Sequence, residues 1–115
     1  MNAESVNRYK TRLETQRDAV KRSLDRHDAD LRHTHVIPDI AGSDRAAEIE
    51  ESVLESRIVE SEELLLGKIE YALDRIERGV YGLCEACGEA IPEARLDAKP
   101  SVSLCVDCQE AKESR

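Results

Sequence analysis

The sequence contains no Phe and no Trp, and its only aromatic residues are three Tyr. A core must therefore be built mainly from aliphatic side chains, which suit the narrow seam between paired helices. There is no apolar run long enough to cross a bilayer, and the opening residues lack the apolar segment of a secretory signal. We therefore expect a cytoplasmic protein with no membrane association.

The chain has fewer basic than acidic residues. The chain has 17 Lys and Arg against 25 Asp and Glu, with a formal net charge of −8 at pH 7. This balance argues against general attraction to nucleic-acid phosphates, so direct, sequence-specific DNA binding is not expected and a basic partner is favoured. The sequence also shows no nucleophile–base pair and no phosphate-binding loop, so we do not expect an enzyme.

Two long segments have the apolar periodicity of helices. The first runs from about Asn2 to Leu31, and its apolar residues return near seven-residue steps at Val6, Leu13 and Val20. The second begins at Ser43 or Asp44, which can cap it, and ends near Arg78. Its apolar stripe consists of Ile58, Leu65, Ile69, Ala72 and Ile76.

The segment between them contains Pro38 and Gly42 and has no helical period, so the chain is expected to reverse there. The fold class is then mainly α, with an antiparallel two-helix coiled-coil hairpin over residues 1–79 and a tip at about 32–43. In this register Tyr9 lies opposite Tyr71. Gly79 can stop the second helix in the left-handed conformation.

Four cysteines form the strongest signal. Cys84-x-x-Cys87 and Cys105-x-x-Cys108 are separated by seventeen residues, within the range typical of four-cysteine zinc sites. We expect one zinc ion to be bound in a small zinc-finger module over residues 80–115, ending in a short C-terminal helix through Glu113. Since four thiolates fill the tetrahedron and leave no place for an activated water, the zinc is structural.

Two other interpretations of metal-binding residues are weaker. Disulfides are disfavoured because cysteines in a reducing cytoplasm, grouped as two close pairs, are better explained by metal. His33 and His35 could suggest a second metal site, but the zinc tetrahedron is complete without them, so loop histidines are expected.

The run YGLCEACGEAIPEARLDAKPSVSLCVDCQ, residues 81–109, resembles the zinc module of the DksA/TraR family. The run SDRAAE, residues 43–48, resembles the coiled-coil tip of DksA-type members. The resemblance implies a non-enzymatic transcription regulator that binds RNA polymerase, with the zinc end at the rim of the secondary channel and the tip directed at the catalytic magnesium. It implies that Asp44 and Ala46 act at the tip, where Ala41 replaces the first acid of the motif; nearby Asp39 is expected to be a turn residue.

The resemblance also implies a guanosine tetraphosphate site shared with the polymerase, linked to the stringent response. The matching positions are Leu65, Lys68 and Lys99. Lys99 stands where the family pattern has Arg, and Gln109 stands where it has Lys, so phosphate contact is reduced.

The alternative function is a zinc-stabilised coiled-coil adaptor that binds other proteins and does not act on polymerase. The residues available for such an interface lie off the predicted stripe and are Leu54, Val59, Leu64, Leu66 and Leu73. A pull-down with core RNA polymerase distinguishes the two functions.

Overall fold

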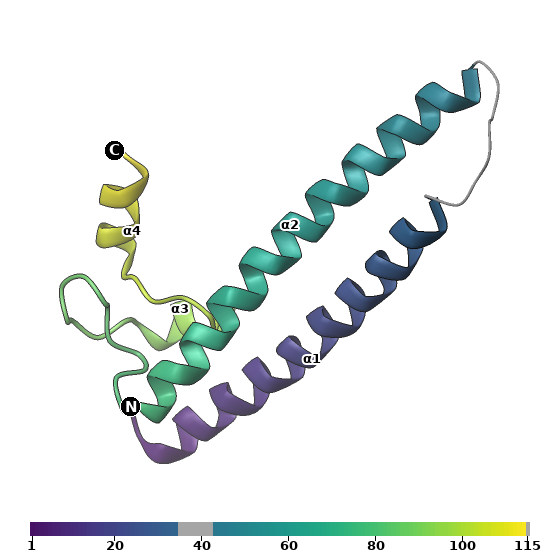
Figure 1. Ribbon diagram of the computed structural model, residues 1–115. Coiled ribbons are helices and arrows are strands. Elements are labelled where there is room, and N and C mark those ends of the chain that lie inside the picture. The colour runs from purple at the N-terminus through teal and green to yellow at the C-terminus, as the bar shows by residue number, and fades with distance from the viewer. Residues whose placement is uncertain (35–42, 115) are drawn as a thin grey trace. The chain divides into compact units, whose positions relative to one another are not determined.

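The computed structural model describes residues 1–34 and 43–114, with side-chain surroundings for residues 1–27 and 53–114. It contains four helices within these ranges: α1 (Ala3–Thr34), α2 (Ser43–Glu77), α3 (Glu93–Ala98) and α4 (Val106–Glu113). Figure 1 shows α1 and α2 running antiparallel as neighbours, as the predicted hairpin requires. The predicted fold class is thereby confirmed. None of the described helices combines the length and apolar character needed to cross a membrane.

Contacts divide the chain into two compact units. The cysteine unit comprises Met1–Arg17 and Gly67–Arg115, and the hairpin unit comprises Asp18–Leu66. The predicted domain boundary between residues 79 and 80 stays a prediction. Most of the predicted tip, including Asp39 and Ala41, lies outside the described residues.

The core of the cysteine unit joins the start of α1, the end of α2 and the segment that follows. Its buried apolar residues are Tyr9, Leu13, Ile69, Ala72, Tyr81, Ile91, Leu96 and Leu104. The Tyr9 ring packs against Tyr81, with centroids 5.8 Å apart and planes at 49°. Tyr71, which was predicted opposite Tyr9, is 40% exposed, so its ring lies outside this core. Tyr71 precedes buried Ala72 by one residue, and one residue turns a helix by about 100°.

Hydrogen bonds tie α1 to the region around α3. The Tyr9 hydroxyl donates to Asp97 Oδ1 at 2.7 Å, and Arg12 Nη2 donates to the Asp97 carbonyl oxygen at 2.9 Å. The Tyr81 hydroxyl donates to the carbonyl oxygen of Pro100 at 2.8 Å. Both buried tyrosines therefore satisfy their hydroxyl groups while their rings fill the core.

Replacing Tyr9 with phenylalanine is expected to lower the free energy of unfolding by about 1 kcal/mol at neutral pH, through loss of the bond to Asp97. The hydrogen bond to Asp97 and burial raise the pKa of Tyr9 above its ordinary value of 10.0. The folded state therefore holds this proton more tightly than the unfolded state, and its contribution is lost as pH rises above 10. Denaturant unfolding between pH 7 and 11 should show that the free energy of unfolding falls less steeply with pH in Tyr9→Phe than in the unaltered chain. Equal slopes for the two proteins would contradict this.

The hairpin unit has a partly polar seam. Val20 of α1 is buried, while Ser23 Oγ donates to Glu62 Oε1 at 2.7 Å and His27 Nδ1 lies 2.9 Å from Glu55 Oε1. Glu55 and Glu62 are seven residues apart and so share one face of α2.

The predicted position of Ile58 in the seam is wrong, because Ile58 is 47% exposed. Val59 and Leu66, which the sequence placed off the stripe, are half-buried. The apolar pattern was misleading here because glutamates occupy positions that face α1.

Candidate metal centre

The first cysteine pair lies on a tight turn that follows α2. Gly79, at φ 76°, lies two residues after the end of α2 and stops the helix there, as predicted. Cys84 is buried and its N–H donates to the Glu89 carbonyl oxygen at 2.8 Å. The N–H of Gly88 donates to the Cys84 carbonyl oxygen at 2.9 Å, and Gly88 has φ 78°, a left-handed conformation that favours glycine. This turn brings Cys84 and Cys87 to the same side.

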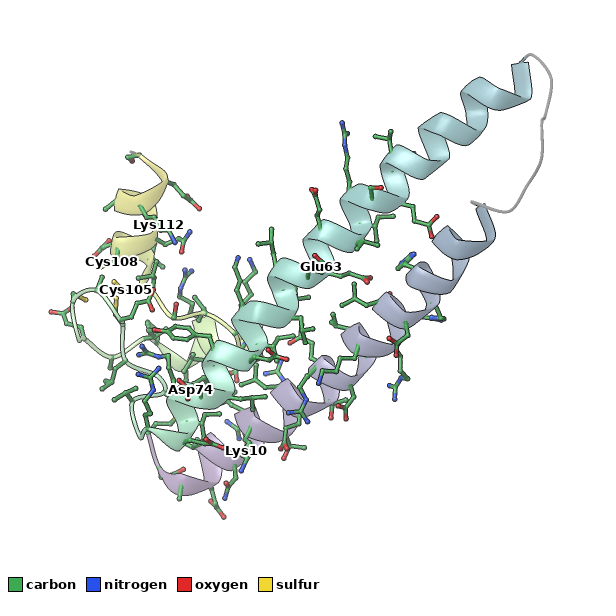
Figure 2. The ribbon with its side chains drawn as sticks, in the orientation of Figure 1. Lys10, Glu63, Asp74, Cys105, Cys108 and Lys112 are labelled. Carbon is green, nitrogen blue, oxygen red and sulfur yellow. The ribbon has the colours of Figure 1, made fainter. Side chains whose placement is uncertain are left out.

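The second pair opens α4. Cys105 is the N-cap of this helix, and its sulfur accepts a hydrogen bond from the Cys108 N–H at 3.5 Å. One helical turn separates the two residues, so their sulfurs share a face. Figure 2 shows Cys105 and Cys108 together at the start of α4. The predicted C-terminal helix through Glu113 is confirmed.

The two pairs converge into one cluster. The Glu85 N–H donates to the Ser103 carbonyl oxygen at 2.9 Å and joins the two segments. All four sulfurs lie within 4.8 Å of one another, and the Cys87 and Cys105 sulfurs are 3.8 Å apart. Tetrahedral zinc with Zn–S bonds of about 2.3 Å places its ligands about 3.8 Å from each other. The cluster therefore fits one zinc ion, and the four cysteines are free thiols rather than disulfides.

The electrostatics of the cluster also favour a cation. Backbone N–H groups of Cys105 and then Cys87 point at the Cys84 sulfur and lower its pKa to about 6. The pKa of Cys108 is raised, first by its side-chain hydrogen bond with Cys105 and then by that with Cys84. One thiolate forms readily, whereas crowded sulfurs oppose further ionisation until a divalent cation compensates the charge. The cofactor is one structural zinc ion, as predicted.

The other predicted site residues are not gathered at the cluster. Lys68 and Lys99 are exposed in the cysteine unit, whereas Leu65 is half-buried in the hairpin unit. The Gln109 amide donates to Glu113 Oε1 at 3.0 Å. The predicted nucleotide contacts stay predictions.

The predicted tip residues lie near the start of α2. Asp44 and Ala46 follow Ser43 in this helix, and their side chains fall outside the described part. His33 lies within α1 and not in a loop, which corrects the expectation, while His35 is outside the described residues.

Sequence reasoning missed α3 and the burial of Arg75. Pro92 at the N-cap of α3, followed by Glu93 in its first turn, was the available signal for a short helix. Arg75 lies in the last turn of α2 and is only 7% exposed. Its position three residues after Ala72, on the buried side of α2, was the signal that it faces inward.

Comparison with known proteins agrees with this arrangement. Residues 79–114 match the sequence model of the prokaryotic DksA/TraR C4-type zinc finger. The whole chain is 36% identical, over 119 aligned residues, to the RNA polymerase-binding transcription factor DksA of Salmonella typhimurium, of which it covers 76%.

Two solved structures are similar over nearly the whole chain. The transcription factor DksA2 from Pseudomonas aeruginosa matches with a TM-score of 0.86 and 31% identity, over 100% of this chain and 88% of that one. The RNA polymerase binding protein and transcriptional regulator Dks from Chlamydia trachomatis matches with a TM-score of 0.61 and 26% identity, over 99% and 93%. Because the relationship extends along the full chain, this protein belongs to the DksA/TraR family of C4-type zinc-finger proteins.

Proposed function

We propose that this chain binds RNA polymerase and regulates transcription initiation, with Cys84, Cys87, Cys105 and Cys108 as the ligands of its zinc. The observation that carries this proposal is the 36% identity, along the full chain, to a relative named for binding RNA polymerase. The partner is a cytoplasmic enzyme, and the chain itself carries out no reaction.

The hairpin supplies the working end in this proposal. It enters the secondary channel of the polymerase, and Asp44 and Ala46 at the start of α2 approach the catalytic centre. A formal net charge of −8 suits a channel lined with basic groups, because complementary charge speeds and orients encounter. The cysteine unit remains at the channel rim, where zinc holds it folded.

Guanosine tetraphosphate is the proposed co-regulator. The ammonium groups of Lys68 and Lys99 are exposed and available to phosphate, and Leu65 lies three residues before Lys68 on α2. Lysine contacts phosphate as a point charge and cannot replace the bidentate arginine contact. Gln109 adds no charge. A modest response to the nucleotide is therefore expected.

The Asp44→Asn variant is expected to lose most of its effect on a ribosomal promoter, on the order of tenfold, while binding polymerase nearly as well as the unaltered chain. The reason is that the amide keeps the shape of the tip and removes its charge. In vitro transcription with purified polymerase, with and without the nucleotide, measures the effect. Glu63→Gln is the matched control, because Glu63 is an exposed acid farther along the same helix (Figure 2). Equal regulation by Asp44→Asn and the unaltered chain would remove this role.

The second candidate function is a coiled-coil adaptor, which the exposed leucines of α2 favour. Leu54 is 57% exposed and Leu64 is 69% exposed, and both lie on the hairpin unit. A pull-down with core RNA polymerase decides between the two functions. Binding that a second secondary-channel factor displaces supports regulation through the channel, whereas binding that ignores the competitor supports the adaptor.

A further inference from the structure

Each cysteine pair is preceded by a peptide unit that an arginine holds. The carbonyl oxygen of Leu83, immediately before Cys84, accepts a hydrogen bond from Arg75 Nη2. The carbonyl oxygen of Leu104, immediately before Cys105, accepts one from Arg95 Nε at 3.1 Å. The two arginines come from different elements, α2 and α3, yet they make the same contact at equivalent positions.

Arg75 is the more deeply buried of the two. It is 7% exposed, and its Nη2 also donates to the Val80 carbonyl oxygen at 3.1 Å. Its guanidinium carbon lies 5.7 Å from the centre of the Tyr71 ring. The Tyr71 hydroxyl in turn donates to Glu85 Oε2 at 2.7 Å. The last turns of α2 therefore hold the first cysteine loop on both sides of Cys84.

Fixing these peptide units fixes the cysteines, because a peptide group is planar. With the Leu83 carbonyl oxygen held by Arg75, the Cys84 N–H of the same plane is directed at the Glu89 carbonyl oxygen, to which it donates at 2.8 Å. Because both the Leu83 carbonyl oxygen and the Cys84 N–H are held, the position of the Cys84 α-carbon is restricted. Arg95 limits the Leu104–Cys105 unit in the same way at the entrance to α4.

The positive charges of the two arginines also favour binding of the metal by the cysteines. Four thiolates and one Zn²⁺ leave a net negative charge at the centre. A guanidinium group carries a full positive charge, and each of the two lies against the backbone that bears the proposed ligands. Each arginine therefore offsets part of the repulsion among the sulfurs.

We propose that Arg75 and Arg95 are positioning residues of the zinc centre, which preorganise the two cysteine pairs for the metal. This inference rests on the proposed assignment of the four cysteines as ligands. A group that orients metal ligands from outside typically contributes a factor of about 10–100 to metal affinity.

The test compares zinc affinity among four variants by competition with a chromophoric chelator. Arg75→Gln and Arg95→Gln are each expected to bind zinc about 10–100-fold more weakly than the unaltered chain. Arg78→Gln is the matched control, since Arg78 is an exposed arginine directly after the end of α2 and its side chain pairs only with Asp74 among the contacts described. Its affinity should change by less than about threefold. Arg75→Lys keeps the positive charge but lacks the planar guanidinium, so its zinc affinity should lie between that of Arg75→Gln and that of Arg78→Gln.

A spectroscopic measurement separates positioning from general support of the fold. Cobalt substituted for zinc should give altered visible bands in Arg75→Gln and Arg95→Gln, because the sulfur tetrahedron is distorted. A purely structural role would lower the thermal stability of the metal-loaded protein and leave the cobalt spectrum unchanged; that result overturns the proposal.

Folding of the variants is checked by helix content from circular dichroism. Should Arg75→Gln not fold, Arg75→Lys and Arg95→Gln decide the matter, and unchanged zinc affinity in both rejects the proposal. If the unaltered chain itself binds no zinc, the ligand assignment fails, and the arginine proposal fails with it.

Discussion

The Cys84→Ser variant is expected to contain almost no zinc after purification, whereas the unaltered chain should contain about one ion. Serine offers a neutral hydroxyl in place of a thiolate, and zinc holds such an oxygen poorly beside three sulfurs. Structural zinc sites in small domains contribute about 10–16 kcal/mol of apparent binding free energy, so loss of one ligand removes a large share of it.

The fold of the cysteine unit should change with the metal. Apart from Cys84 and Pro100, the buried apolar side chains between Val80 and Cys108 are few, namely Tyr81, Ile91, Leu96 and Leu104. So small a core cannot order the segment alone, and zinc binding supplies much of the folding free energy. Cys84→Ser, like chelation of the unaltered chain, should therefore expose residues 80–113 to protease while α1 and α2 retain helix.

Elemental analysis of zinc, thermal unfolding and limited proteolysis measure these effects. The matched control is Ala86→Ser, which introduces the same hydroxyl at an exposed position between Cys84 and Cys87. It should retain one zinc ion and the protease resistance of the unaltered chain. A Cys84→Ser protein that keeps stoichiometric zinc, or a metal-free protein that stays fully folded, would contradict the assigned role of the centre.

The Leu96→Ala variant is expected to lose about 2–5 kcal/mol of the free energy of unfolding. Leu96 is fully buried, and it is the buried residue of α3, a helix of six residues. A helix this short is not stable alone and depends on the apolar contact that Leu96 makes. Truncation leaves a cavity beside the zinc loop, because the Leu96 side chain lies 3.9 Å from the position a Cβ would take on Gly82.

Denaturant unfolding of the zinc-loaded protein measures this loss. Val106→Ala is the matched control, because Val106 is an aliphatic residue that is 47% exposed at the start of α4. Val106→Ala should change the free energy of unfolding by no more than about 0.5 kcal/mol. Leu96→Ala should still bind one zinc ion, since its side chain contributes no ligand. A cost for Leu96→Ala no greater than that of the control would mean that α3 does not anchor the cysteine unit.

The locally encoded features could be predicted from the sequence. Helical periodicity predicted α1 and α2. The reversal predicted at Pro38 and Gly42 lies outside the described residues and stays a prediction. Two close cysteine pairs at a suitable spacing indicated one metal cluster, and the sulfurs do converge. The stop at Gly79 was also correct. The helices, the stop at Gly79 and each cysteine pair by itself depend on residues within a few turns of one another, where backbone geometry limits the outcomes.

Only the tertiary structure decided which side chains meet across the chain. It placed Tyr9 against Tyr81, turned Glu55 and Glu62 toward α1 while Ile58 stayed exposed, and brought Arg75 to the cysteine loop. An apolar pattern ranks positions by hydrophobicity alone, so it overlooks charged residues that find hydrogen-bond partners outside their own helix. Those partners exist only once the segments have packed together, and that is why the sequence by itself determined the helices and the cysteine pairs of the cluster but not the contacts that hold them in place.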